Sequence, residues 1–180
     1  SKEADQLAGE IADKLKQAEK PLIISGTSLG SEAGMEAAAN IAYALCTEEK
    51  RADLSLTVPE ANSMGLAMMG GKTLGEAFET VDKEEADNVV ILENDLYRRD
   101  EHKKVDHFLN EAKQVITLDY HETETTLNAD IVLPAGSFAE SDGTLVNNEG
   151  RAQRFYQVFV TNDDIHESWR WIREVLRAAD

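Results

Sequence analysis

Short runs of apolar, often β-branched residues recur along the chain, each bounded by glycine, proline or polar residues. They predict five β-strands, near residues 22–25, 54–58, 88–92, 114–118 and 130–133. The run at 88–92, Asn-Val-Val-Ile-Leu, is continuous, which is typical of a strand buried on both faces of a parallel sheet. Residues 155–160 alternate weakly and predict an edge strand or an extended tail.

Between these runs the apolar residues recur at the helical period. They predict helices at about residues 3–19, 32–46, 61–71 (with part of it loop), 73–80, 97–113 and 164–179. The last helix begins behind the polar and acidic residues 162–164, and one stripe of it carries Ile165, Trp169, Ile172, Leu176 and Ala179. We expect it to dock on the core through Trp169 and Ile172.

Strands separated by helices predict an α/β fold: a three-layer α/β/α sandwich with a largely parallel, Rossmann-like sheet of about five strands. We favour the strand order 2-1-3-4-5. We expect one domain over residues 1–180, cut from a longer protein, with a long polar loop at about 134–154 and a C-terminal helix at about 164–179. In such folds ligands bind outside the carboxyl ends of the strands.

Charge and cysteine content narrow the possible functions. The chain has 18 basic and 35 acidic residues and a net charge of −17, so it should repel nucleic acid and anionic membrane surfaces. No apolar run approaches the ~18 residues that a membrane-spanning helix needs. A single cysteine cannot hold an iron–sulfur cluster or any other multi-cysteine metal site.

Several short motifs are weak. Glycines at 26, 30 and 34 do not have the spacing of a dinucleotide-binding loop, and Gly71-Lys72-Thr73 lacks the earlier glycine of a phosphate-binding loop. His121 and Glu124 could share a metal ion, although a solvated surface histidine is the more common situation. No histidine lies at a predictable distance from Ser137. We therefore expect no catalytic, cofactor-binding or metal-binding residues.

The long loop and the strand before it carry an ordered set of residues: Asp119, Thr123-Glu124-Thr125, residues 129–135 (Ala-Asp-Ile-Val-Leu-Pro-Ala), Glu140, Gly143-Thr144, Asn147, Glu149-Gly150-Arg151 and Gln153. This order resembles the signature of molybdopterin oxidoreductases, in which T-E-T-A…A-D-V-V-L-P leads into E-x-x-G-T-x-x-N-x-E-G-R-x-Q. Asn62, Gly65 and Gly70 resemble the family's upstream N-x-x-G-x-x-x-x-G segment. Thr126 stands where that signature usually has alanine.

Within the family, the form VNNEGRAQRF is most similar to the large iron–sulfur subunits of bacterial proton-pumping NADH:quinone oxidoreductases (respiratory complex I). The resemblance implies a structural, non-catalytic domain without molybdopterin, in a parent that passes electrons from NADH through 4Fe-4S and 2Fe-2S clusters to quinone. It implies as partners the rest of the parent subunit and other peripheral-arm subunits. It also implies a peripheral location on the cytoplasmic side of the inner membrane.

The alternative is a cofactor-holding domain of an active molybdenum or tungsten enzyme such as a formate dehydrogenase. The predicted strand ends carry Glu60, Glu93, Asp95 and Asp119, which would oppose the pyrophosphate of a pterin dinucleotide. Our hypothesis is that the long loop closes on the protein itself. In this hypothesis Gly143 and Gly150 permit turns with positive φ. The side chains of Glu140, Asn147 and Arg151 satisfy backbone groups, with Arg151 facing Glu140.

Overall fold

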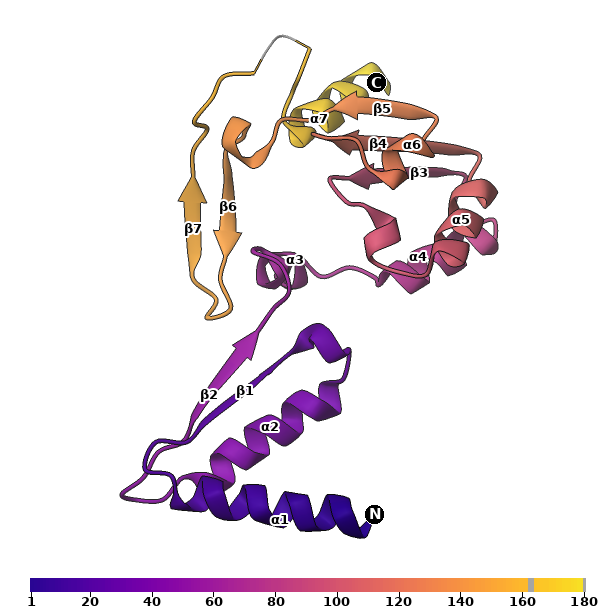
Figure 1. The fold of residues 1–180 in the computed structure, drawn as a ribbon. Helices are drawn as coiled ribbons and strands as arrows, with labels where there is room; N and C mark the ends of the chain where they lie inside the picture. The colour runs from indigo at the N-terminus through magenta and orange to yellow at the C-terminus, as the bar shows by residue number, and fades with distance from the viewer. Residues whose placement is uncertain (162–163, 180) are drawn as a thin grey trace. The chain divides into compact units, whose positions relative to one another are not determined.

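The structure is a computed structural model that describes residues 1–161 and 164–179 (Figure 1). These residues form two compact units. Unit 1 comprises Ser1–Met69 and Leu145–Gln153, and unit 2 comprises Gly70–Thr144 and Arg154–Asp180. The single domain predicted from the sequence stays a prediction. No helix among the described residues has the length and apolar character needed to cross a membrane.

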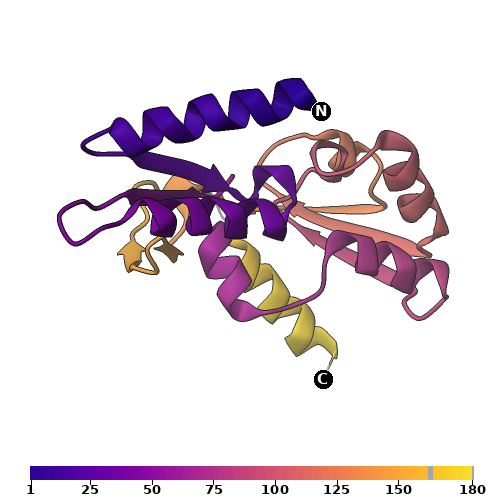
Figure 2. The ribbon, with the colours of Figure 1, turned by 90° about the horizontal axis from the view of Figure 1, so that it is seen from below.

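Unit 1 is built on a pair of parallel strands with helices running alongside (Figures 1 and 2). Its elements are α1 (Lys2–Gln17), β1 (Leu22–Gly26), the 3-10 turn η1 (Thr27–Leu29), α2 (Glu32–Leu45), β2 (Asp53–Thr57) and α3 (Ser63–Met69). Strands β1 and β2 pair in register from Leu22↔Asp53 to Gly26↔Thr57. Helix α2 packs on both strands and buries Ala38 and Ala42, whose small side chains allow a close approach.

Unit 2 is built on a parallel sheet with the strand order β3-β4-β5. Its first elements are α4 (Leu74–Asp82), β3 (Asn88–Leu92), η2 (Leu96–Arg98), α5 (His102–Glu111) and β4 (Gln114–Asp119). They are followed by α6 (Glu124–Leu127), β5 (Ile131–Pro134), η3 (Phe138–Glu140) and α7 (Ser168–Ala179). Two further strands, β6 (Gly143–Val146) and β7 (Ala152–Phe155), pair with each other.

The two faces of the β3-β4-β5 sheet are covered differently. Helices α4 and α5 contact each other, with the rings of Phe78 and Phe108 4.6 Å apart. Their buried side chains form the main core together with Ile91 and Val115 of the strands. The opposite face forms an apolar groove of about 280 Å³ with α7, lined by Val90, Leu92, Ile116, Leu118, Leu133, Trp171, Ile172, Val175 and Leu176.

All five predicted strands are present, and they pair in parallel as two sheets, β1–β2 and β3–β4–β5. The pairs β2–β1 and β3–β4–β5 belong to the favoured order 2-1-3-4-5, and the complete order stays a prediction. The expectation that β3 is buried on both faces is wrong for the described residues. Strand β3 lies at the edge of its three-stranded sheet, where Val90 is 50% exposed. Continuous β-branched residues therefore mark a strand without fixing how deeply it is buried.

Several predicted boundaries are corrected. The helix expected at 97–113 starts at His102, because residues 96–98 first form a 3-10 turn that buries Leu96 and Tyr97. Of the two alternatives for residues 155–160, the edge strand is wrong, because β7 ends at Phe155 and residues 156–160 form no strand. Strand β6 lies in the predicted long loop, and helix α6 lies in a segment for which no element was predicted. Both are too short to produce a periodic pattern.

The C-terminal helix begins at Ser168, whereas the sequence predicted about residue 164. Asn162 and Asp163 of its expected start lie outside the described residues. The expected docking through Trp169 is wrong, because Trp169 is 51% exposed. Trp171 faces the sheet instead, and its Nε1 donates a hydrogen bond to the Pro134 carbonyl at 2.7 Å. Ile172 lines the groove as expected.

Candidate functional site

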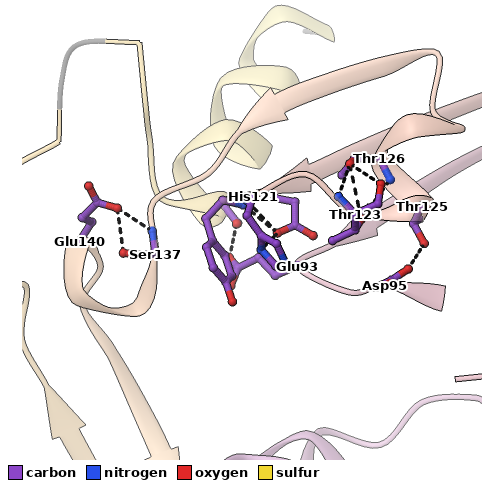
Figure 3. A network of polar contacts seen from close by, with 11 residues as sticks. Glu93, Asp95, His121, Thr123, Thr125, Thr126, Ser137 and Glu140 are labelled. Atoms are coloured by element: carbon purple, nitrogen blue, oxygen red, sulfur yellow. Dashed lines mark hydrogen bonds and ion pairs between the residues drawn. The ribbon is translucent and has the colours of Figure 1, made fainter. Parts of the chain in front are cut away.

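The carboxyl ends of β3, β4 and β5 form the candidate site, and all of its residues belong to unit 2 (Figure 3). Parallel pairing of Leu92 with Leu118 and of Asp119 with Pro134 brings the three strand ends to one edge of the sheet. In parallel α/β sheets this edge is where ligands bind. The polar groups found here therefore decide whether the site can hold a cofactor.

Glu93, directly after β3, turns the chain away from the sheet. Its φ of 47° is in the left-handed region, which is uncommon for a residue with a side chain and costs about 1 kcal/mol or more. Its amide donates a hydrogen bond to the Leu118 carbonyl at 2.7 Å, and its carboxylate accepts one from the Ser168 hydroxyl at the start of α7. The strained residue is thus tied to both β4 and α7, so its carboxylate is already engaged.

Asp95, two residues further on, is engaged by the Thr-Glu-Thr segment. The buried Thr125 hydroxyl donates to the Asp95 carboxylate and accepts from the Leu96 amide, both at 2.8 Å (Figure 3). Thr125 is 1% exposed, so losing either bond would leave a polar group with little access to water. Thr125 therefore connects α6 to the loop that follows β3.

Thr126 completes the cap of α6. Its hydroxyl accepts from the Thr123 amide at 2.8 Å and donates to the Thr123 carbonyl at 2.9 Å. In return, the Thr126 amide donates to the Thr123 hydroxyl at 3.1 Å, which closes a capping box. Alanine, the usual family residue here, could not satisfy the Thr123 amide. The departure from the signature has a local structural reason.

Asp119, at the end of β4, is 7% exposed and also bonds within the chain. Its Oδ1 accepts from the Tyr120 amide at 2.8 Å and lies 3.5 Å from Nδ1 of His121. The metal pair considered from the sequence is not formed, because Glu124 lies 3.4 Å from His102 instead. Within residues 1–161 and 164–179, no group of three or more potential metal ligands is present.

A pocket of about 390 Å³ opens at this edge. It is lined by Asp119, Tyr120, His121, Glu122, Thr126, Leu127, Val132 and Pro134. The lining includes two carboxylates and neither lysine nor arginine. A pyrophosphate is normally held by basic side chains and helix N-termini, so this donor set does not fit the dinucleotide of a molybdopterin cofactor.

The long loop closes on itself at its start, as hypothesised. Oε2 of Glu140 accepts from the Ser137 amide at 3.0 Å and from the Ser137 hydroxyl at 2.8 Å. These two hydrogen bonds lower the pKa of Glu140, the backbone contribution being the larger. The Gly136 amide donates to the His166 carbonyl at 3.0 Å, which ties the loop to the segment before α7.

The tip of the loop belongs to unit 1 and is held by Asn147. Its side-chain oxygen accepts from the amides of Glu149 and Arg151 at 3.1 and 2.9 Å, as hypothesised. Gly150 has the expected positive φ of 80°. Gly143 does not, and glycine is needed there because a side chain would collide with the Phe155 ring.

The expected pairing of the Arg151 side chain with Glu140 stays a prediction, because Arg151 belongs to unit 1 and Glu140 to unit 2. Within the described part of unit 1, Arg151 bonds to Asn147 through its backbone, and its guanidinium forms no hydrogen bond or ion pair. The carboxylate of Glu140, its expected partner, binds Ser137. This carboxylate is already engaged in a local capping box with Ser137, three residues earlier.

The two glycine-containing motifs, at residues 26–34 and 71–73, lead into helix caps. After Gly30, with φ of 59°, the Ser31 hydroxyl accepts from the Gly34 amide and begins α2. Thr73 begins α4 in a capping box with Glu76, and these hydrogen bonds lower the pKa of the Glu76 carboxyl. The serine and threonine positions satisfy helix amides rather than a ligand.

Comparison with known proteins extends these observations. The molybdopterin oxidoreductase family matches residues 4–178. The chain is 56% identical to the G subunit of NADH-quinone oxidoreductase from Pseudomonas fluorescens, over 98% of this chain and 20% of that protein. It is 48% and 45% identical to the proteins of the same name from Shewanella oneidensis and Escherichia coli (strain K12), over 92% of this chain and 19% of each relative.

The chain therefore spans about a fifth of the length of the curated relatives it matches. The signature residues of the long loop, the parallel α/β sheet and the family match over residues 4–178 agree with one another. The chain belongs to the molybdopterin oxidoreductase family.

Proposed function

We propose that this chain is a structural, cofactor-free domain of the G subunit of an NADH-quinone oxidoreductase. The observation that carries the proposal is the identity of 45–56% to proteins of that name along 92–98% of the chain. In this proposal the parent passes electrons from NADH through iron–sulfur clusters to quinone. The clusters lie outside these 180 residues, because a single cysteine cannot hold one.

The state of the strand-end carboxylates supports a structural role. Glu93 binds Ser168, Asp95 binds Thr125, and Asp119 binds the amide that follows it. Groups already satisfied by the protein gain little from a ligand and would have to lose these bonds to accept one. The acidic pocket at the same edge would also repel a pyrophosphate.

We further propose the place of the domain in its parent. Its partners would be the rest of the parent subunit and other subunits of the peripheral arm of the complex. That arm would lie on the cytoplasmic side of the bacterial inner membrane, with this domain outside the bilayer. The net charge of −17 supports contact with protein rather than with anionic lipid or nucleic acid.

Calorimetric titration of the purified chain tests the cofactor-free state. We expect no saturable binding of molybdopterin guanine dinucleotide or NADH at ligand concentrations up to about 1 mM. A Kd of about 1 mM corresponds to a binding free energy near −4 kcal/mol. A cofactor-binding protein of the same family serves as the positive control for the dinucleotide. Micromolar binding of the dinucleotide would favour the active-enzyme alternative and contradict the proposal.

A further inference from the structure

The charge of the chain is unevenly distributed along the sequence. Residues 150–180 contain five arginines and five acidic residues, so the whole net charge of −17 falls on residues 1–149. Four of the eight arginines belong to unit 2 and come from the end of β7 and from α7: Arg154, Arg170, Arg173 and Arg177. Residues 150–180 are therefore neutral overall, and four of their arginines lie in unit 2.

A pocket of about 280 Å³ lies in this region, lined by Asp142, Gly143, Thr144, Arg154, Glu167, Trp169 and Arg170. The negative charge of Glu167, which is buried in this pocket, is compensated by Arg170, whose Nε lies 2.7 Å from Oε2. Oε1 of Glu167 accepts a hydrogen bond from the Asp142 amide at 2.9 Å. The Asp142 carboxylate accepts from the Gln157 amide at 2.6 Å. The Arg154 guanidinium forms no ion pair or hydrogen bond with the described residues.

Aromatic rings hold these guanidinium groups. Arg154 lies over the ring of Tyr156, 5.2 Å from its centroid. Arg170 and Arg173 both lie over the ring of Trp169, at 5.2 and 5.3 Å from its centroid. Trp169 and Tyr156 are 51% and 65% exposed. Stacking orients a guanidinium while leaving its N–H edge free to bind a carboxylate. Arg170 already pairs with Glu167, and Arg173 donates to Glu174 at 2.9 Å, so the edge that stays available is that of Arg154. Exposed tryptophan, tyrosine and arginine are also the residues that contribute most to protein interfaces.

We propose that these five residues, Arg154, Tyr156, Trp169, Arg170 and Arg173, form a docking surface for an acidic segment of another polypeptide. One carboxylate of that segment enters the pocket and binds Arg154. The charge favours a peptide with separated carboxylates over a polyanion such as nucleic acid, because Asp142 and Glu167 lie beside the arginine. Remote acidic residues of the chain interfere little, since a Debye length of about 8 Å screens them at physiological salt.

The inference does not depend on the proposed function, and it is tested on the 180-residue chain alone. The chain has two tryptophans, so Trp171→Phe leaves Trp169 as the only indole reporter. This variant is titrated with a short peptide alternating glutamate and alanine. We expect a saturable change in Trp169 fluorescence that weakens as NaCl is raised. Arg154→Gln should raise Kd about tenfold, the effect of losing a charge-assisted contact, and Arg154→Lys should raise it less.

The matched control is Arg51→Gln, which makes the same charge change at an exposed arginine of unit 1 and should leave Kd unchanged. Circular dichroism checks that each variant is folded. The proposal is overturned by equal affinity for a glutamine–alanine peptide, by an equal loss in Arg51→Gln, or by no saturable change in fluorescence. A dimer that Arg154→Gln dissociates, in the absence of peptide binding, would also overturn it and assign the surface to a second copy of the chain.

Discussion

The backbone amide of Val146 donates a hydrogen bond to Oδ1 of Asn62, 2.8 Å away and 84 residues earlier in the chain. Both residues belong to unit 1. Asn62 is part of the N-x-x-G segment, and Val146 directly precedes Asn147 in the long loop. Gly65 permits this arrangement, because a side chain there would collide with the Asn62 amide. Two parts of the family signature thus bind each other.

Asn62→Ala should lower the free energy of unfolding by about 1–3 kcal/mol, because the partly buried Val146 amide would lose its acceptor. Urea denaturation measures the change. Asn148→Ala is the control: its exposed side chain donates to the Leu56 carbonyl at 2.8 Å, which water can satisfy after the substitution. An effect of Asn62→Ala no larger than that of Asn148→Ala would show that the bond between the two segments contributes nothing of its own.

Thr126→Ala should destabilise unit 2 by about 1–2 kcal/mol, which is a usual cost of losing a helix cap. The substitution leaves the buried Thr123 amide without its acceptor, although alanine is the residue expected from the family signature. Thr126→Ser keeps the hydroxyl and should recover most of the loss. Thermal unfolding compares the three proteins, and equal melting temperatures for the alanine and serine variants would contradict this account of the cap.

Trp171→Phe should lower stability by about 1 kcal/mol through loss of the indole hydrogen bond to the Pro134 carbonyl. Trp169→Phe, at the exposed neighbouring tryptophan, should change stability by less than about 0.5 kcal/mol. Chemical denaturation of both variants checks the assignment. The reverse ranking would restore the docking role that was predicted for Trp169.

Glu140 should titrate below the ordinary pKa of a glutamate, because both Ser137 hydrogen bonds favour its charged form. A carboxyl whose pKa is lower in the folded state stabilises the fold above its unfolded pKa, and this contribution is lost as pH falls through the folded value. Ser137→Ala removes the hydroxyl hydrogen bond and keeps the larger backbone one, so it should raise the pKa of Glu140 part of the way toward normal. Carbon-13 NMR titration of the carboxyl measures it, and an unchanged pKa in the variant would contradict the capping box.

The five main strands could be predicted because each is a local run of apolar residues, as in Val89 to Leu92 and Val115 to Leu118. Strand β6 and helix α6 could not, since pairing with β7 and the Thr123–Thr126 cap stabilise segments only four residues long. The prediction that Trp169 docks on the core was wrong because it assumed that the last helix begins near residue 164. A start at Ser168 places Trp171 and Ile172 on the groove, and Ile165 outside the helix.

The candidate site was predictable in its location and chemistry but not in its contacts. Strand ends and acidic residues can be read from the sequence, so Glu93, Asp95 and Asp119 were identified. Their partners were missed, because Ser168 lies 75 residues from Glu93 and Thr125 lies 30 from Asp95. The Thr-Glu-Thr motif was the available signal for Thr125, whereas nothing in the sequence singled out Ser168.

The structural role predicts that damage to the domain reduces assembly and leaves the chemistry of assembled complexes unchanged. The most direct measurement uses a bacterium whose parent subunit carries Thr125→Val, with Thr125→Ser as the control that keeps the hydroxyl. NADH:quinone turnover is measured in membranes and divided by the amount of assembled complex on native gels. We expect fewer assembled complexes, because the Leu96 amide and Asp95 lose their partner, and normal turnover per complex. A fully assembled complex with reduced turnover would contradict the proposal.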